Sequence, residues 1–117
     1  MNYKHGSLEN IILNAIWNYE ETGSEVITVT DVHNKINLQH GQNWAYTTIK
    51  TVMDRLVEKG KLNRLRVAKK FAYKSVFSRE ELGRAEIMNL AQQYFNDDLI
   101  MLSKAVDKIL SENSVLV

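Results

Sequence analysis

The sequence predicts a mainly α-helical protein with a small β-sheet, and three observations support that fold class. Apolar residues recur at helical spacing in five separate segments of the chain. Residues 62–67 and 71–76, which follow the third of these segments, have the composition of a β-hairpin. The chain has 117 residues, 44% of them hydrophobic and 25% charged, so it can form one globular domain with a short helical appendage.

The first part of the chain predicts a helix, a short strand and a second helix. Residues 8–19 place apolar side chains at i, i+3, i+4, i+7 and i+8, and Ser7 can cap this helix. The β-branched run VITV at residues 26–29 predicts one small strand after a loop. Thr30 is the predicted N-cap of a second helix, DVHNKINL. The residues of that helix expected to face inward are Val32, Ile36 and Leu38.

The stretch NWAYTTIKTVMDRLVEKGKL, residues 43–62, predicts a helix with two unlike faces. Its polar face carries Thr47, Lys50 and Thr51 within about 100° of the helix circumference, with Arg55 beside them. The opposite face carries the apolar residues Ile49, Val52, Met53 and Leu56.

The next segment predicts a basic β-hairpin. Gly60 is expected to end the preceding helix near Lys59 with a left-handed C-cap. Two β-like runs follow, at 62–67 and 71–76, and residues 68–70 are the predicted turn although they include no Gly or Asn. The arms and tip carry the cationic side chains Arg64, Arg66, Lys69, Lys70 and Lys74.

Two more helices are predicted after the hairpin. Ser78 to Glu81 reads S-x-x-E, a capping box, and the helix that it begins is expected to run to about Phe95. Residues 96–98 break the pattern and can cap a last helix. The apolar sides of the two helices comprise Leu82, Ala85, Met88, Ala91 and Phe95, and then Leu99, Leu102, Val106 and Ile109.

The order helix, strand, helix, helix, hairpin is that of a winged helix-turn-helix. We therefore expect residues 1–77 to form a winged helix-turn-helix domain and residues 78–117 a helical dimerisation region. The two last helices exceed what a compact winged helix needs, and a two-fold dimer would bury their apolar sides. Packing within the chain is the alternative for about half of the candidate interface residues, which are Met88, Phe95, Leu99, Leu102, Val106 and Ile109.

Charge is unevenly distributed along the chain. Residues 1–42 carry a net charge of −3, residues 43–74 of +7 and residues 75–117 of −3, which together give +1. The central block holds nine Lys and Arg residues against Asp54 and Glu58. Such a block is typical of a surface that binds a polyanion, and the alternative is a solvated basic face.

The predicted third helix and hairpin both lie in this basic block, which favours contact with double-stranded DNA. A recognition helix packs on its neighbours with one side and enters the major groove with the other, where hydroxyl and cationic side chains reach bases and phosphates. Threonine is a mediocre helix former, so its repeated use favours a role for the hydroxyls or the methyls. Alternatively, Thr47 and Thr48 are merely tolerated in the first turn. Asp54 would repel phosphate, so it is expected either to pair with a neighbouring Arg or to lie beyond the groove.

The third-helix segment also resembles a known family. Residues 44–60, WAYTTIKTVMDRLVEKG, are similar to the signature of the penicillinase and methicillin-resistance repressors and the copper-responsive repressors, the BlaI/MecI/CopY family. The resemblance covers most of the chain, and the third-helix motif is its specific part. It extends to Leu8-Glu9, Ile16-Trp17, Tyr73 and residues 78–81.

The resemblance implies a dimeric winged-helix repressor whose N-terminal domain binds a palindromic operator. Copper-responsive members carry a C-terminal cysteine cluster, whereas this chain has no cysteine. Antibiotic-responsive members are cleaved at an Asn-Phe bond, and the nearest dipeptide here is the reversed Phe95-Asn96. The inducing signal is therefore open. The residues expected to contact DNA are Trp44, Tyr46, Thr47, Thr48, Lys50, Thr51, Arg55, Arg66, Lys69 and Lys70.

Other function classes have little support in the sequence. Without cysteine, disulfides and thiolate sites are excluded, and His5, His33 and His40 have no metal-ligand spacing. No catalytic serine grouping or phosphate-binding loop occurs, so we expect no enzyme and no cofactor. The absence of a membrane span and of a signal-peptide pattern predicts a cytoplasmic protein. The alternatives to a sequence-specific repressor are a winged helix that binds protein instead of DNA and a non-specific, architectural DNA-binding protein.

Two tryptophans and one glycine carry separate expectations. Trp17 is expected in the core. Trp44 is expected either to pack as a staple before the third helix or to reach the DNA backbone with its indole N–H. Gly83 inside a helix costs about 1 kcal/mol relative to Ala, which suggests close approach of another helix across the dimer.

Overall fold

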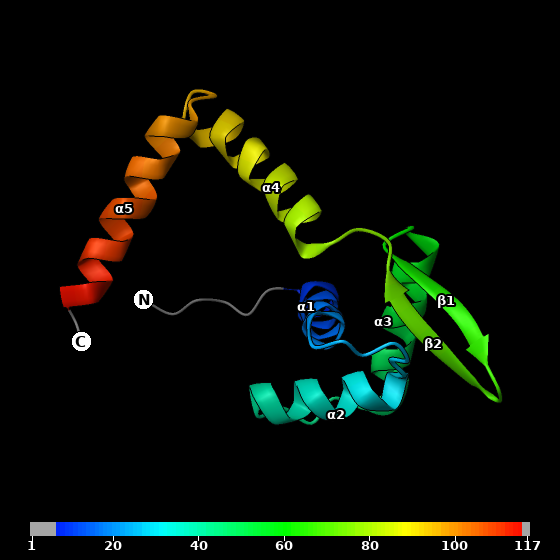
Figure 1. Cartoon of the computed structure of the whole chain (residues 1–117). Helices are drawn as coiled ribbons and strands as arrows, with labels where there is room; N and C mark the ends of the chain where they lie inside the picture. The colour runs from blue at the N-terminus through cyan, green and yellow to red at the C-terminus, as the bar shows by residue number, and fades with distance from the viewer. Residues whose placement is uncertain (1–6, 116–117) are drawn as a thin grey trace. The chain divides into compact units, whose positions relative to one another are not determined.

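The structure, a computed structural model, describes residues 7–115 as a winged helix-turn-helix and two further helices (Figure 1). It divides into two compact units, Met1–Arg79 and Glu80–Val117. The winged helix forms the first unit, which confirms the predicted fold class. The elements in chain order are α1 (Leu8–Glu21), α2 (Val29–His40), α3 (Tyr46–Glu58), β1 (Leu62–Val67), β2 (Lys70–Ser75), α4 (Arg79–Tyr94) and α5 (Leu99–Val115).

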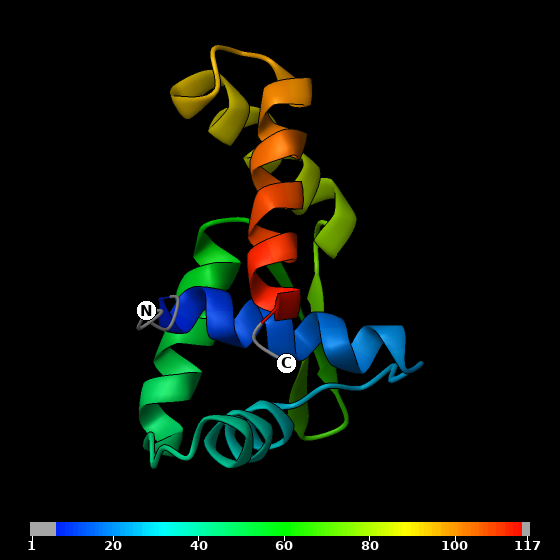
Figure 2. The same cartoon turned by 90° about the vertical axis from the view of Figure 1, so that its left-hand side faces the viewer.

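The core of the first unit lies where α1, α2 and α3 meet. The three helices contact one another, and α1 crosses α3 (Figure 2). Leu38 is 86% exposed, so its predicted inward position is wrong. It follows Ile36 by two residues, which in a helix turns its side chain to the other side. The side chains that are fully buried in this core include Ile12, Ile16, Val32, Ile36, Ile49, Met53 and Leu56.

The predicted ends of α1 and α3 are confirmed. The Ser7 hydroxyl accepts a hydrogen bond from the Asn10 N–H at 3.3 Å and so caps α1. At the end of α3, Gly60 has a φ of 75°, the left-handed conformation that glycine adopts without steric cost. The Lys61 N–H then donates to the Leu56 carbonyl at 2.9 Å, which satisfies a carbonyl of the last turn.

The predicted strand at residues 26–29 is wrong, and so is the predicted N-cap at Thr30. The Thr28 hydroxyl accepts from the Asp31 N–H at 3.2 Å, and the Asp31 carboxylate accepts from the Thr28 N–H at 2.9 Å. This reciprocal capping box begins α2 at Val29, two residues earlier than expected. What remains of the strand is Ile27, which is 1% exposed and whose carbonyl accepts from the Tyr73 N–H at 2.8 Å.

The predicted hairpin is confirmed, with a turn one residue shorter than expected. β1 and β2 pair antiparallel, and Val67 lies opposite Lys70, so only Ala68 and Lys69 form the loop. Ala68 has a φ of 57°, a positive value that two-residue hairpin loops require and that L side chains other than Asn and Asp rarely adopt. The turn thus carries local strain at Ala68.

Ala68→Gly is expected to stabilise the fold by about 0.5–1 kcal/mol, because removing the Cβ relieves about 1–2 kcal/mol of left-handed strain and the greater flexibility of unfolded glycine offsets part of it. Urea unfolding followed by circular dichroism measures the change. Ala72→Gly, at the third residue of β2, is the matched control and should lower the stability of the fold instead. A loss of stability in Ala68→Gly would contradict the strain at this turn.

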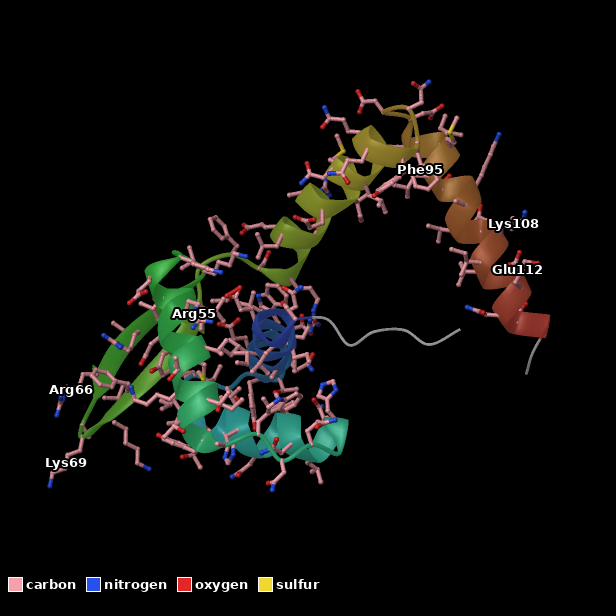
Figure 3. All side chains as sticks on the ribbon, turned by 180° about the vertical axis from the view of Figure 1, so that it is seen from behind. Arg55, Arg66, Lys69, Phe95, Lys108 and Glu112 are labelled. Atoms are coloured by element: carbon pink, nitrogen blue, oxygen red, sulfur yellow. The ribbon has the colours of Figure 1, made fainter. Side chains whose placement is uncertain are left out.

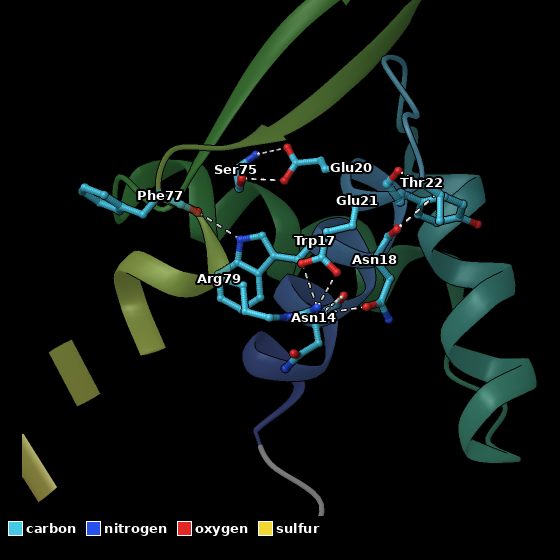
Figure 4. Close-up of polar contacts among 10 residues, drawn as sticks. Asn14, Trp17, Asn18, Glu20, Glu21, Thr22, Ser75, Phe77 and Arg79 are labelled. Atoms are coloured by element: carbon cyan, nitrogen blue, oxygen red, sulfur yellow. Dashed lines mark hydrogen bonds and ion pairs between the residues drawn. The ribbon is translucent and has the colours of Figure 1, made fainter. Parts of the chain in front are cut away.

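Hydrogen bonds and an ion pair hold the end of β2 and the segment that follows it against α1 (Figure 4). The buried Trp17 donates its indole N–H to the Phe77 carbonyl at 3.0 Å, which confirms its predicted place in the core. Glu20 accepts from the Ser75 hydroxyl at 2.6 Å. The Arg79 guanidinium donates to both carboxylate oxygens of Glu21, at 2.6 and 2.8 Å. These contacts hold the exit of the first unit against its first helix.

The second unit consists of α4 and α5, joined by a turn in which Asn96 and Asp97 both have positive φ. The Asp98 carboxylate accepts from the Ile100 and Met101 N–H groups, so it caps α5 as predicted. α4 begins at Arg79, directly after Ser78. Among residues 7–115, a Cβ added to Gly83 would meet nothing within 4 Å, so no close approach to Gly83 is made by these residues.

Candidate nucleic-acid interface

The polar face of α3 is exposed and its apolar face is buried, as the helical spacing predicts. Thr47, Thr48 and Thr51 are exposed, and Lys50 beside them is partly covered. The burial of Ile49 and its apolar neighbours fixes the rotation of α3 about its axis, because turning the helix would expose them. The three hydroxyls are therefore presented together on the outer face of α3.

The hairpin forms a basic wing beside α3. Arg66 and Lys69 lie towards its far end and project away from the helices (Figure 3). The Phe71 ring lies under two guanidinium groups, with the Arg64 Cζ at 4.7 Å and the Arg66 Cζ at 5.7 Å from its centroid. These cation–π contacts hold both arginines along one face of the wing.

A notch of about 210 Å³ lies between the wing and the first residues of α2 and α3. Sequence reasoning missed the contribution of α2, because the capping box at Thr28 was not recognised as the start of that helix. The residues that line the notch are Thr28, Val29, Thr30, Tyr46, Lys50, Lys69, Lys70, Phe71 and Tyr73.

Asp54 links α3 to both strands of the wing. Its carboxylate accepts from Lys50 Nζ at 2.8 Å, from Arg64 Nη1 at 3.0 Å and from the Tyr73 hydroxyl at 2.8 Å. Of the two alternatives for Asp54, pairing with a neighbouring Arg is confirmed. The bond to Tyr73 was missed because only the tertiary structure brings β2 next to α3. The pairing with Lys50 was also missed, although its i, i+4 spacing within one helix is visible in the sequence.

The network around Asp54 shifts the pKa of two groups. Burial opposes ionisation of Asp54, but hydrogen bonds from Lys50, Tyr73 and Arg64 outweigh it and lower the pKa of this carboxyl. Burial and the adjacent Asp54 carboxylate raise the pKa of Tyr73 to about 12. Asp54 is therefore an anion and Tyr73 a neutral donor at physiological pH.

Comparison with known proteins decides the family. The sequence model of the family described as Penicillinase repressor matches residues 5–115. The chain belongs to the penicillinase repressor family. Its members are DNA-binding transcriptional repressors and not enzymes, and the interface described above lies within the matched residues. No curated protein matches the chain.

Among solved structures, this family member is similar to the monomeric form of Bacillus licheniformis BlaI in complex with the blaP half-operator, with 23% identity, a TM-score of 0.49 and coverage of 68% of this chain and 88% of that chain. It is also similar to the ferric uptake regulator of Francisella tularensis with iron, with 16% identity, a TM-score of 0.48 and coverage of 79% and 81%. A MarR family protein of Bacillus stearothermophilus has 18% identity, a TM-score of 0.46 and coverage of 97% and 78%.

The two aromatic residues predicted to contact DNA lie at the beginning of α3. Trp44 is half-buried, its ring meets the edge of His40, and its carbonyl accepts from the Asn37 amide at 3.1 Å. Tyr46 is exposed and packs edge-on against His33. The packing of Trp44 favours its staple role, and its contact with DNA stays a prediction.

Most residues predicted at the dimer interface are exposed within a single chain. Met88, Leu99, Val106 and Ile109 are exposed and Phe95 is half-buried. Leu102 is buried, together with Ala91 of α4. α4 and α5 thus leave most of their apolar side chains uncovered.

The part of the chain that the structure describes contains neither a candidate metal site nor a membrane-spanning helix. Within residues 7–115, no group of three His, Asp or Glu side chains could hold a metal ion, and His5 lies outside those residues. No helix in the same range is long and apolar enough to cross a membrane.

Tyr73→Phe is expected to lower the free energy of unfolding by about 1–2 kcal/mol, because it removes a hydrogen bond to a charged group from a side chain that is 1% exposed. Since the pKa of Asp54 is lowered in the fold, its ionised network stabilises the protein above its ordinary pKa of 3.8, and this contribution is lost as pH falls through the lower folded-state pKa. The difference in free energy of unfolding between wild type and Tyr73→Phe should therefore become smaller at acidic pH. Urea unfolding at neutral pH and at about pH 3 measures it, and a gap that is independent of pH would contradict this coupling.

Proposed function

We propose that this member of the penicillinase repressor family is a sequence-specific repressor that acts in the cytoplasm as a homodimer on a palindromic operator. The observation that supports this best is the surface formed by α3, the wing and the start of α2. It combines three exposed threonine hydroxyls with lysine and arginine side chains, on the side of α3 away from the core. This combination suits a base-reading helix flanked by phosphate contacts.

In the proposed complex, α3 enters the major groove with its N-terminal half. Thr47, Thr48 and Thr51 discriminate bases through hydroxyl and methyl contacts. Lys69 and Lys70 bind phosphates from the wing, and the notch between the wing and α2 receives one strand of the sugar–phosphate backbone. Further phosphate or backbone contacts come from Trp44, Tyr46, Arg55 and Arg66, and Lys50 contacts DNA from the same face of α3 as the threonines.

The second unit supplies the proposed dimer interface. The uncovered apolar side chains of α4 and α5 form a surface that a second copy of the chain can bury around a two-fold axis. A two-fold dimer presents two recognition helices to two half-sites, so a palindromic operator follows from the symmetry of the protein. Repression is then exclusion of the polymerase from the promoter.

Selection from a random duplex pool by the full-length protein tests this proposal. Bound sequences are read out, and affinity for the enriched sequence is measured at two salt concentrations. An enriched palindrome whose affinity falls with salt is the expected result. Salt-sensitive binding without a motif would replace the proposal with an architectural role. No binding at low salt would leave a winged helix that binds protein.

A further inference from the structure

An acidic side chain lies in the middle of this basic surface. Asp54 and Glu58 are the two acidic residues among residues 43–74, against nine Lys and Arg. Glu58 is exposed at the end of α3, whereas Asp54 is partly covered between α3 and the wing. A carboxylate there repels DNA phosphate and weakens purely electrostatic attraction. The partners of Asp54 decide what this carboxylate contributes.

The ion pair with Asp54 restricts Lys50. Lys50 lies one turn before Asp54 in the N-terminal half of α3, on the same face as Thr47 and Thr51. With its Nζ 2.8 Å from the carboxylate, the ammonium stays over the outer face of the helix. That face is the one that a recognition helix turns to the base edges, where lysine pairs with guanine O6 and N7.

The restriction is reversible, because the pairs are open to solvent. The side chains of Lys50, Asp54 and Arg64 are 45%, 27% and 37% exposed. Ion pairs of such exposure are weak and can exchange partners. In contact with any DNA, phosphate therefore competes with Asp54 for both cations. The Tyr73 side chain, by contrast, is buried. Its hydroxyl donates to the Asp54 carboxylate and keeps it in place when a cation leaves.

We propose that Asp54 is a specificity-determining positioning residue, which reserves Lys50 for a base contact by competing with phosphate for the Lys50 and Arg64 cations. Non-operator DNA is held by phosphate contacts alone, so it loses the attraction of these cations in full. The operator keeps part of this attraction, because Lys50 can contact an operator base from the position in which Asp54 holds the ammonium. This inference rests on the proposed function and adds the residue that separates operator from other DNA.

Asp54→Asn tests the proposal, because the amide oxygen can still accept from Tyr73 while the charge that holds the cations is gone. Affinity for a random duplex is expected to rise about fivefold to tenfold at 0.1 M salt, with a slope of log K against log salt steeper by about 0.9 for each cation released. Affinity for the selected operator is expected to rise less or to fall. A repeated selection should show a relaxed preference at one position of each half-site. In a Lys50→Ala background, these changes should shrink.

Two matched variants separate the alternatives. Glu58→Gln removes the same charge from the same helix, and Tyr73→Phe removes a contact of Asp54 while keeping its charge. If Asp54→Asn matches Glu58→Gln, or changes operator and random affinity by one common factor, Asp54 does not determine specificity and the inference is overturned. If the wild type binds no DNA at low salt, the proposed function itself fails.

Discussion

The double substitution Val106→Asp with Ile109→Asp is expected to make the protein monomeric and to lower operator affinity by about a hundredfold or more, because a dimer gains about 10²- to 10⁴-fold by binding both half-sites at once. Both side chains lie on α5 and are 44% and 52% exposed within one chain, so the fold of the monomer tolerates aspartate there. In the proposed dimer the same positions are buried, and an unpaired carboxylate in an apolar interface is costly.

Sedimentation equilibrium measures the association state, and fluorescence anisotropy with a labelled operator measures affinity. Lys104→Asp is the matched control, because it changes the net charge by the same two units at an exposed position on the other side of α5. The control should remain dimeric. A double variant that dimerises as tightly as wild type would place the dimer interface elsewhere. A monomeric wild type that binds its operator tightly would refute the homodimer.

Lys69→Ala combined with Lys70→Ala is expected to weaken binding to all DNA sequences alike, by about a hundredfold at 0.1 M salt in a dimer that uses both wings. Both lysines are exposed at or next to the turn of the hairpin and line the notch beside α2. Each lost phosphate contact should reduce the slope of log K against log salt by about 0.9. Titration of operator and random duplexes at several salt concentrations gives both quantities.

The matched comparison is Thr47→Ala, which removes a hydroxyl from the outer face of α3 without changing charge. It should leave the salt dependence unchanged and alter which sequence is preferred, since base contacts carry the discrimination. An equal loss on every sequence would count against base reading by Thr47. Sequence-dependent losses in the lysine variant would likewise show that the wing does more than bind phosphate.

The predictions that held concern features that a short stretch of chain decides. The rotation of α3 follows from apolar residues spaced so that Ile49, Met53 and Leu56 share one side, and no distant residue is needed to see it. Ser7 begins α1 and Gly60 ends α3 where expected, because helix capping depends on one or two neighbouring residues.

The failed prediction of a strand at residues 26–29 and of an N-cap at Thr30 concerns a choice between two local possibilities. Val26–Val29 has the composition of a strand, yet Thr28 and Asp31 form a capping box and the helix begins there. β-Branched residues favour a strand only where a partner strand pairs with them. The single hydrogen bond from Tyr73 to Ile27 is too little to extend the sheet.

The sequence by itself determined the helices, the hairpin and the concentration of positive charge on residues 43–74, because periodicity, caps and composition are written in consecutive residues. The pairing of Asp54 with Lys50 follows from the i, i+4 spacing of one helix, but the contacts of Asp54 with the wing depend on tertiary packing. Its partners Arg64 and Tyr73 are 10 and 19 residues away along the chain, and the packing of the wing against α3 brings them within hydrogen-bonding distance. Such long-range pairings depend on how the elements pack, and no spacing rule in the chain encodes them.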